Sequence, residues 1–276
     1  MKRIAALLAA SALMLSLAAC GDFAPDPTDS PDMALDFEYT ASTFPDFASS
    51  RAYEPLAGAV TAIMLGMSRA DAAEHYTLCS SAEAARIAAD GGVALVPQYA
   101  DIPSGVDSAP VARDALVFFT GEGSGVDSLS SAELRNIFTG REGSWSAFGG
   151  EGDIQILARP EGSGSIAALK ELVSCDEALV TGEGAPLTGG AAIGFGLWSE
   201  CVLMGLADGY SIIAVDGVEP TEENIASGEY ALGLDTLALV SSSAAADSGE
   251  RALWLWLQGG VGQAFISSQG YMEAVR

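Results

Sequence analysis

Basic residues are scarce in this chain of 276 residues, which holds 12 Lys and Arg against 37 Asp and Glu, for a formal net charge of −25. Lys2 and Lys170 are its only lysines, and neither lies in the Gly-Lys-Ser/Thr step of a nucleotide-binding phosphate loop. A surface this acidic repels nucleic acid and anionic lipid, so we exclude broad binding to either.

Histidine occurs once, at position 75, which excludes metal sites built from several histidines. His75 and Cys79 are four residues apart and could share a helix face as a nucleophilic dyad. No third group to orient the histidine is evident, so we favour a surface histidine beside a buried cysteine. The Gly–Ser segments do not place serine centrally in a Gly-x-Ser-x-Gly frame. We therefore expect no enzyme activity, no metal and no cofactor.

The N-terminus carries the strongest local signal in the sequence. Lys2 and Arg3 precede an apolar run over residues 4–17 that is too short to span a bilayer comfortably and fits a signal peptide. Its end, Leu-Ala-Ala-Cys, resembles the lipobox of bacterial lipoproteins, in which the cysteine, here Cys20, carries the lipid after cleavage. We predict a signal peptide over 1–20 and a lipid on Cys20 that anchors an extracytoplasmic protein to the cell membrane, followed by an acidic, proline-rich tether over 21–37.

The remaining cysteines, Cys79, Cys175 and Cys201, form an odd set. An extracytoplasmic location allows a disulfide between Cys175 and Cys201. Free buried cysteines account for the sequence equally well. The pairing therefore stays open.

Short apolar runs alternate with helix-like segments along the folded part. Serines begin several of these segments, as Ser130 does with Glu133 three residues later in a capping-box pattern. Helices are predicted over 53–67, 82–89, from 130, over 166–173, 251–257 and 261–267, and strands over 93–97, 115–119, 154–158, 212–215 and 237–240. This alternation indicates an α/β fold with mainly parallel sheets.

The segment from Arg159 to Ser165 lies between a predicted strand and a predicted helix. Its small residues let backbone N–H groups approach a ligand, and the helix start adds a partial positive charge. Ser163 and Ser165 add hydroxyl donors, and the guanidinium of Arg159 fits tetrahedral oxyanions. The segment is a candidate anion cradle, but the pattern taken alone favours a simple serine cap with loop glycines.

Several short motifs occur together in a characteristic order from about residue 44 to the C-terminus. They are Ala-Leu-Val-Phe-Phe at 115–119, Leu-Ser-Ser-Ala-Glu-Leu-Arg-Asn-Ile-Phe-Thr-Gly at 129–140, Trp145 with Phe-Gly-Gly at 148–150, Arg159 with Ser-Gly-Ser at 163–165, Ala-Ile-Gly-Phe at 192–195, the 216–230 segment and Gly-Gln at 262–263 before Gly-Tyr at 270–271. This order resembles the phosphate-binding proteins of ABC importers, the PstS-like branch of two-lobed solute receptors.

The resemblance implies a type II periplasmic-binding-protein fold, in which each lobe is a mixed, mainly parallel sheet flanked by helices. Lobe 1 would comprise 38–115 and 231–276, and lobe 2 would comprise 116–230. The family binds its anion between the lobes through three loops at helix starts. The residues that match these loops are Ser50, Arg51, Ala52, Ser80, Ser81, Arg159, Ser163, Gly164 and Ser165.

Two positions depart from the family pattern. Arg51 stands where the family usually has threonine or serine, and Ala94 stands where it has an aspartate that accepts a proton from phosphate. Asp90 and Asp101 are nearby and could substitute.

The expected function is that of a lipid-anchored, monomeric receptor that binds phosphate or a related oxyanion and delivers it to a membrane permease. The alternative is a surface sensor or interaction module on the same scaffold, with anion specificity altered or lost.

Overall fold

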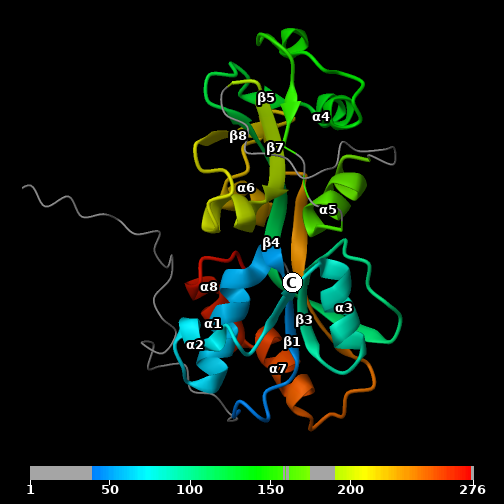
Figure 1. Cartoon of the computed structure of the whole chain (residues 1–276), viewed down its shortest axis with the longest axis vertical. Helices are drawn as coiled ribbons and strands as arrows, with labels where there is room; N and C mark the ends of the chain where they lie inside the picture. The colour runs from blue at the N-terminus through cyan, green and yellow to red at the C-terminus, as the bar shows by residue number, and fades with distance from the viewer. Residues whose placement is uncertain (1–38, 158, 160–161, 175–189, 275–276) are drawn as a thin grey trace, which may run out of the picture.

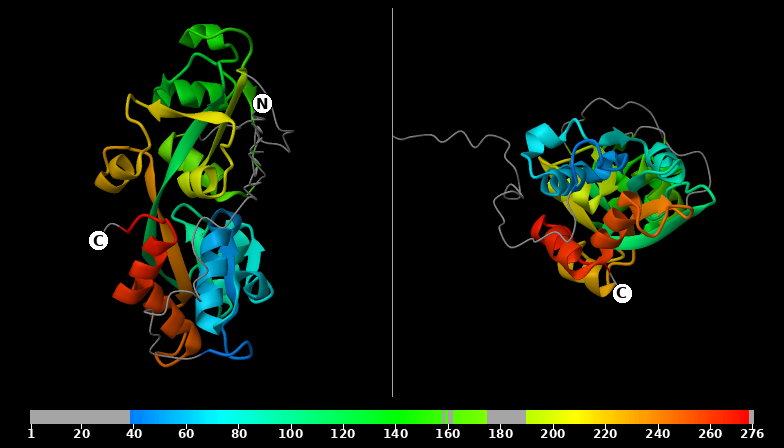
Figure 2. Two further views of the ribbon diagram at one scale, coloured as in Figure 1. Left: turned by 90° about the vertical axis from the view of Figure 1, so that its left-hand side faces the viewer. Right: turned by 90° about the horizontal axis from the view of Figure 1, so that it is seen from below.

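Two long strands, β4 (Val106–Gly121) and β9 (Gly233–Ser241), run through the middle of the molecule and pair antiparallel. This computed structural model describes residues 39–157, 159, 162–174 and 190–274. Figures 1 and 2 show one group of helices and strands at each end of these two strands. The two long strands therefore connect two lobes.

The first lobe is built on parallel strands β1 (Phe47–Ser50), β2 (Thr77–Cys79) and β3 (Val93–Pro97). They continue into the long strands in the order β2-β1-β3-β9-β4. The helices around them are α1 (Glu54–Leu65), which follows the 3₁₀ turn η2 (Arg51–Tyr53), α2 (Arg69–Ala72), α3 (Ser81–Ala89), α7 (Gly249–Gln258) and α8 (Gly260–Ser268).

The second lobe lies at the other end of β4, which pairs antiparallel with both β7 (Ala192–Leu197) and β8 (Tyr210–Val215). Two short strands, β5 (Ser128–Leu129) and β6 (Gln155–Ile156), add parallel pairs at its edges. Its helical segments are α4 (Ser131–Phe138), η3 (Trp145–Phe148), α5 (Gly164–Leu172), the π-helix η4 (Ser199–Leu203) and α6 (Glu222–Ser227).

The predicted fold class is confirmed, because helices flank a mixed sheet throughout. Parallel pairs lie at the sheet edges. The two strands that cross between the lobes, β4 and β9, pair antiparallel, because β4 runs from the first lobe to the second and β9 runs back. The capping box of Ser130 and Glu133 forms as predicted. The proposed lobe boundaries fall within β4 and just before β9 and stay a proposal. In the part of the chain described, no helix is both long and apolar enough to cross a bilayer.

Asp114 is a buried carboxylate in β4 at the junction of the lobes, with 1% of its surface exposed. Its Oδ1 accepts hydrogen bonds from the backbone N–H groups of Ala115 and Ser199 at 2.8 and 3.1 Å, and its Oδ2 accepts one from Ser199 Oγ at 2.6 Å. Burial raises the pKa of Asp114 from 3.8 to about 6, against the lowering effect of these hydrogen bonds. Through these hydrogen bonds Asp114 links β4 to the start of η4.

Asp114→Asn should change how stability depends on pH. The folded protein binds more protons at this site than the unfolded chain between about pH 4 and 6, so the stability that Asp114 contributes falls as the pH rises through that window. The full effect is at most about 3 kcal/mol. Asparagine can accept the two backbone bonds and donate to Ser199 Oγ. Relative to wild type, the variant should therefore gain melting temperature as the pH rises from about 4 to 7.

Asp101→Asn is the matched control, because Asp101 is exposed. Its melting profile should run parallel to that of the wild type. A constant difference between wild type and Asp114→Asn across the same pH range would contradict a raised pKa for Asp114.

Candidate functional site

The carboxyl ends of parallel strands β1 and β2 lie side by side, and each is followed by the start of a helix. β1 ends at Ser50 ahead of η2 and α1, and β2 ends at Cys79 ahead of α3. Ser80 caps α3 by accepting a hydrogen bond from Glu83 N at 3.2 Å, and Ser81 Oγ donates to Ser50 Oγ at 3.2 Å. Because parallel strands present their carboxyl ends at one sheet edge, two helix starts and their hydroxyls meet there.

The second lobe supplies a third helix start, that of α5. Ser163 caps it by accepting a hydrogen bond from Ile166 N at 3.4 Å. A Cβ atom on Gly164 would lie 2.3 Å from Pro97 Cγ and 3.0 Å from Ser81 Oγ, so only glycine lets α5 approach the first lobe this closely. The three helix starts therefore face one another across the junction of the lobes.

A cavity of about 410 Å³ lies where these helix starts meet. The predicted site residues that line it are Ser50, Arg51, Ala52, Ser80, Ser81, Arg159, Ser163 and Gly164. Ser165 is the exception, since it is 1% exposed and accepts a hydrogen bond from Arg159 Nε at 3.2 Å. Ser165 thus orients the guanidinium from behind and does not line the cavity itself.

Glu200, which the sequence analysis did not identify, also lines the cavity. Its Oε1 forms an ion pair with Arg159 Nη2, and the two side chains are only 12% and 16% exposed. Its Oε2 accepts a hydrogen bond from Leu197 N at 3.0 Å. The residues that line the cavity therefore include two cations, Arg51 and Arg159, and one carboxylate. No short motif marks Glu200, because it pairs with a residue 41 positions earlier.

Ala94 does not line the cavity, contrary to the prediction that it replaces an acceptor at the ligand. It is fully buried in β3 within a cluster of small residues that includes Ala84, Ala85 and Ala88 of α3. Small side chains there let α3 pack closely on the sheet, and a carboxylate would be buried among apolar groups. Asp90 and Asp101 are exposed and do not line the cavity either.

His75 and Cys79 line different cavities and do not form a dyad. Cys79 is the last residue of β2 and His75 lies before that strand, so the two cannot share a helix face. Cys79 lies in the cavity between the lobes, where burial is the main cause that raises the pKa of its thiol, so it stays neutral at pH 7. This supports the expectation that the cysteine is not a nucleophile.

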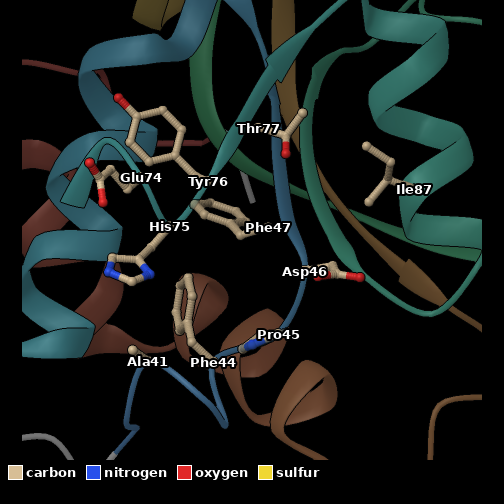
Figure 3. Close-up of a pocket in the computed structure, with 10 residues that line it drawn as sticks. All are labelled: Ala41, Phe44, Pro45, Asp46, Phe47, Glu74, His75, Tyr76, Thr77 and Ile87. Atoms are coloured by element: carbon tan, nitrogen blue, oxygen red, sulfur yellow. The ribbon is translucent and has the colours of Figure 1, made fainter.

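The cavity that contains His75 lies at the opposite, amino ends of β1 and β2 (Figure 3). The rings of His75, Phe44 and Phe47 gather on one side of it, and Asp46 lies on the other. This cavity therefore lies at the other end of β1 and β2 from the predicted anion loops, which follow the carboxyl ends of these strands.

Some predicted features lie outside the described residues, namely the signal peptide, Cys20, the tether and Cys175. Cys201 is free and buried. Because Cys175 lies outside the described residues, whether it pairs with Cys201 stays open.

The geometry of the cavity between the lobes suits a small oxyanion. The three helix starts carry partial positive charge and unpaired backbone N–H groups. The hydroxyls of Ser50, Ser81 and Ser163 lie beside them, and Arg51 and Arg159 supply full positive charge. Among the described residues no group of three or more His, Cys, Asp or Glu side chains is arranged to hold a metal ion.

Comparisons with known proteins find related sequences and similar structures. The chain is 25% identical over 246 residues to the phosphate-binding protein PstS of Bacillus subtilis, an alignment that covers 83% of this chain and 80% of that protein. It resembles the structure of an ABC-type phosphate transport receptor from Vibrio cholerae with a TM-score of 0.63 at 18% identity, covering 82% of this chain and 99% of the other. A phosphate-binding protein from Stenotrophomonas maltophilia gives a TM-score of 0.59 at 13% identity, with 84% and 91% covered.

The similar structures establish the fold, and a family model establishes the superfamily to which the chain belongs. The model of a PBP superfamily domain matches residues 100–266, which is more than half of the chain. The matched region contains β4 and β9, which connect the lobes, and the part of the second lobe that carries Arg159, α5 and Glu200. The protein therefore belongs to the PBP superfamily.

Proposed function

We propose that the protein is the solute-binding component of an ABC importer and that it binds phosphate in the cavity between its lobes. The observation that carries this proposal is the meeting of three helix starts, their serines and Arg159 around one cavity. Each element is a weak anion site alone, but together they surround a ligand with donors from both lobes. A binding protein rather than an enzyme fits this set of groups.

The relatives support phosphate as the ligand. The Bacillus subtilis and Borreliella burgdorferi proteins to which the chain is similar are both named phosphate-binding protein PstS. The Vibrio cholerae structure is named a phosphate transport receptor. The proposal is further supported because the residues that match the family's loops line this cavity, apart from Ser165, which lies directly behind Arg159.

We further propose that Cys20 carries the lipid that anchors the receptor outside the cytoplasmic membrane, that residues 21–37 are its tether, and that it works as a monomer with a membrane permease. The support is the Leu-Ala-Ala-Cys motif and the acidic, proline-rich stretch after it. Lobe closure around the ligand would present the bound form to the permease.

The alternative, a sensor or interaction module with a degenerate site, rested on Ala94. Because Ala94 is part of the core between α3 and the sheet, its identity says nothing about the cavity. No observation among the described residues now favours this alternative.

Arg159→Ala should weaken phosphate binding while the protein stays folded. The guanidinium would make charge-assisted hydrogen bonds to the ligand, so its loss should cost about 1.5–3 kcal/mol, or about ten- to a hundredfold in affinity. Calorimetric titration of the purified mature protein measures the affinity, and thermal melting on the same preparation reports folding. Undiminished phosphate binding by a folded variant would remove Arg159 from the site.

Gly164→Ala should weaken phosphate binding by keeping the lobes apart. The new Cβ would lie 2.3 Å from Pro97 Cγ, so α5 must move away from the first lobe. We expect at least about a tenfold loss of affinity and a larger radius of gyration by X-ray scattering in saturating phosphate. The matched control is Gly260→Ala, because Gly260 is also the first residue of a helix but has no atom within 4 Å of an added Cβ. Equal affinities in both variants would show that close approach at Gly164 is not needed.

Cys20→Ala should release the protein from the membrane or block its processing, because the lipid is attached through the Cys20 sulfur. Membrane fractionation of expressing cells and the mass of the mature N-terminus measure this. A variant that is cleaved correctly and still partitions with the membrane would contradict the lipoprotein prediction.

A further inference from the structure

A second cavity, also of about 410 Å³, lies in the first lobe at the amino ends of β1 and β2. Two segments line most of it, residues 44–47, which lead into β1, and residues 74–77, which lead into β2. Because these strands are parallel, the two segments meet at one edge of the sheet. The volume falls within the range of about 300–1,000 Å³ that is usual for small-molecule sites, so the cavity can hold a small organic ligand.

The aromatic side of this cavity is held in place by ring packing. Phe44 packs edge-on against Tyr39 and Phe47, with ring centroids 5.4 and 6.0 Å apart. The turn before it is also fixed, because Phe44 N donates a hydrogen bond to Thr40 O at 2.9 Å. In Figure 3 the rings of Phe44, Phe47 and His75 gather on one side of the cavity. The faces of aromatic rings carry partial negative charge, so such a lining favours a cation over an anion.

The charged side chains of the cavity point to the same preference. Asp46 and Glu74 line it with exposed carboxylates, and neither side chain has an ion-pair or hydrogen-bond partner among the residues that the structure describes. Among the described residues that line the cavity there is no lysine or arginine. The formal charge of −25 on the whole chain also attracts cations from solution.

We propose that this cavity binds a primary alkylammonium ion, which is an organic cation with an apolar stem. The carboxylates of Asp46 and Glu74 would attract the ammonium group and accept its N–H hydrogen bonds. The ring of Phe44 would add a cation–π attraction, and the stem would pack against Ile87 of α3, which also lines the cavity. This site is separate from the cavity between the lobes and does not depend on the proposed function.

His75 makes the proposal testable by NMR. It is the only histidine of the chain, so its imidazole protons give signals that report on this cavity alone. Titration of the untagged mature protein with butylammonium chloride at fixed pH should shift these signals saturably, with a Kd of about 1 mM or below. The neutral counterpart 1-butanol should bind at least about tenfold more weakly. Tetramethylammonium should also bind more weakly than butylammonium, because it has no N–H donor.

Asp46→Asn combined with Glu74→Gln removes both charges with little change of shape. This double variant should weaken butylammonium binding by about three- to tenfold. Asp101→Asn with Glu223→Gln is the matched control, because both residues are exposed and neither lines the cavity, and it should leave the affinity unchanged within about twofold. Phe44→Leu should weaken binding by about two- to fivefold, with thermal melting of each variant to confirm folding.

The ammonium group could belong to a free amine or to a lysine of a partner protein, and Nα-acetyl-lysine amide distinguishes the two sources. Binding as tight as that of butylammonium indicates a partner's lysine, and weaker binding indicates a free amine; both agree with an ammonium site. Unshifted signals, equal shifts with 1-butanol, or wild-type affinity in the double carboxylate variant would overturn the inference. Phosphate affinity, measured on the same samples, should be the same in the double variant and the wild type, so these outcomes leave the proposed function standing.

Discussion

The antiparallel pairing of β4 with β9 is the constraint on which the rest of the structure depends. These strands are the central members of the sheet order that joins the two lobes. Their ladder shifts register between Pro110 and Ala112, and the Arg113–Asp235 ion pair at 3.0 Å lies just beyond the shift. Tyr230 OH donates a hydrogen bond to Leu116 O at 2.9 Å, just before the chain enters β9. The pairing places the helix starts of one lobe opposite that of the other.

The acidity of the whole chain and the cationic character of its cavity act over different distances. A formal charge of −25 repels anions in the surrounding solution, but salt screens this repulsion beyond about 8 Å at physiological ionic strength. Inside the cavity, helix starts and guanidinium groups act at hydrogen-bond distance and with less water between them. The groups that line the cavity can therefore set its local potential although the rest of the surface is acidic.

The sequence predicted those parts of the site that depend on neighbouring residues. A cap at Ser80 or Ser163 is decided by three or four consecutive positions, so both could be recognised from the chain. Glu200 could not, because its role depends on Arg159, far away in sequence, and on an irregular π-helical turn. Ala94 was misplaced because β3 is buried on both faces, and such an apolar run does not show which side chains face the helix.

The site is assembled from stretches of chain that carry different kinds of groups. The first lobe provides Ser50 and Ser81 at helix starts together with Arg51, while the second provides the Arg159–Glu200 pair and the α5 start. Both lobes line the cavity, but the guanidinium and the carboxylate that pair with each other, those of Arg159 and Glu200, both belong to the second lobe. Substitutions in the Arg159 loop or in η4 can therefore change the charge of the cavity while the serine loops of the first lobe stay unchanged, so the two halves of the lining can vary separately.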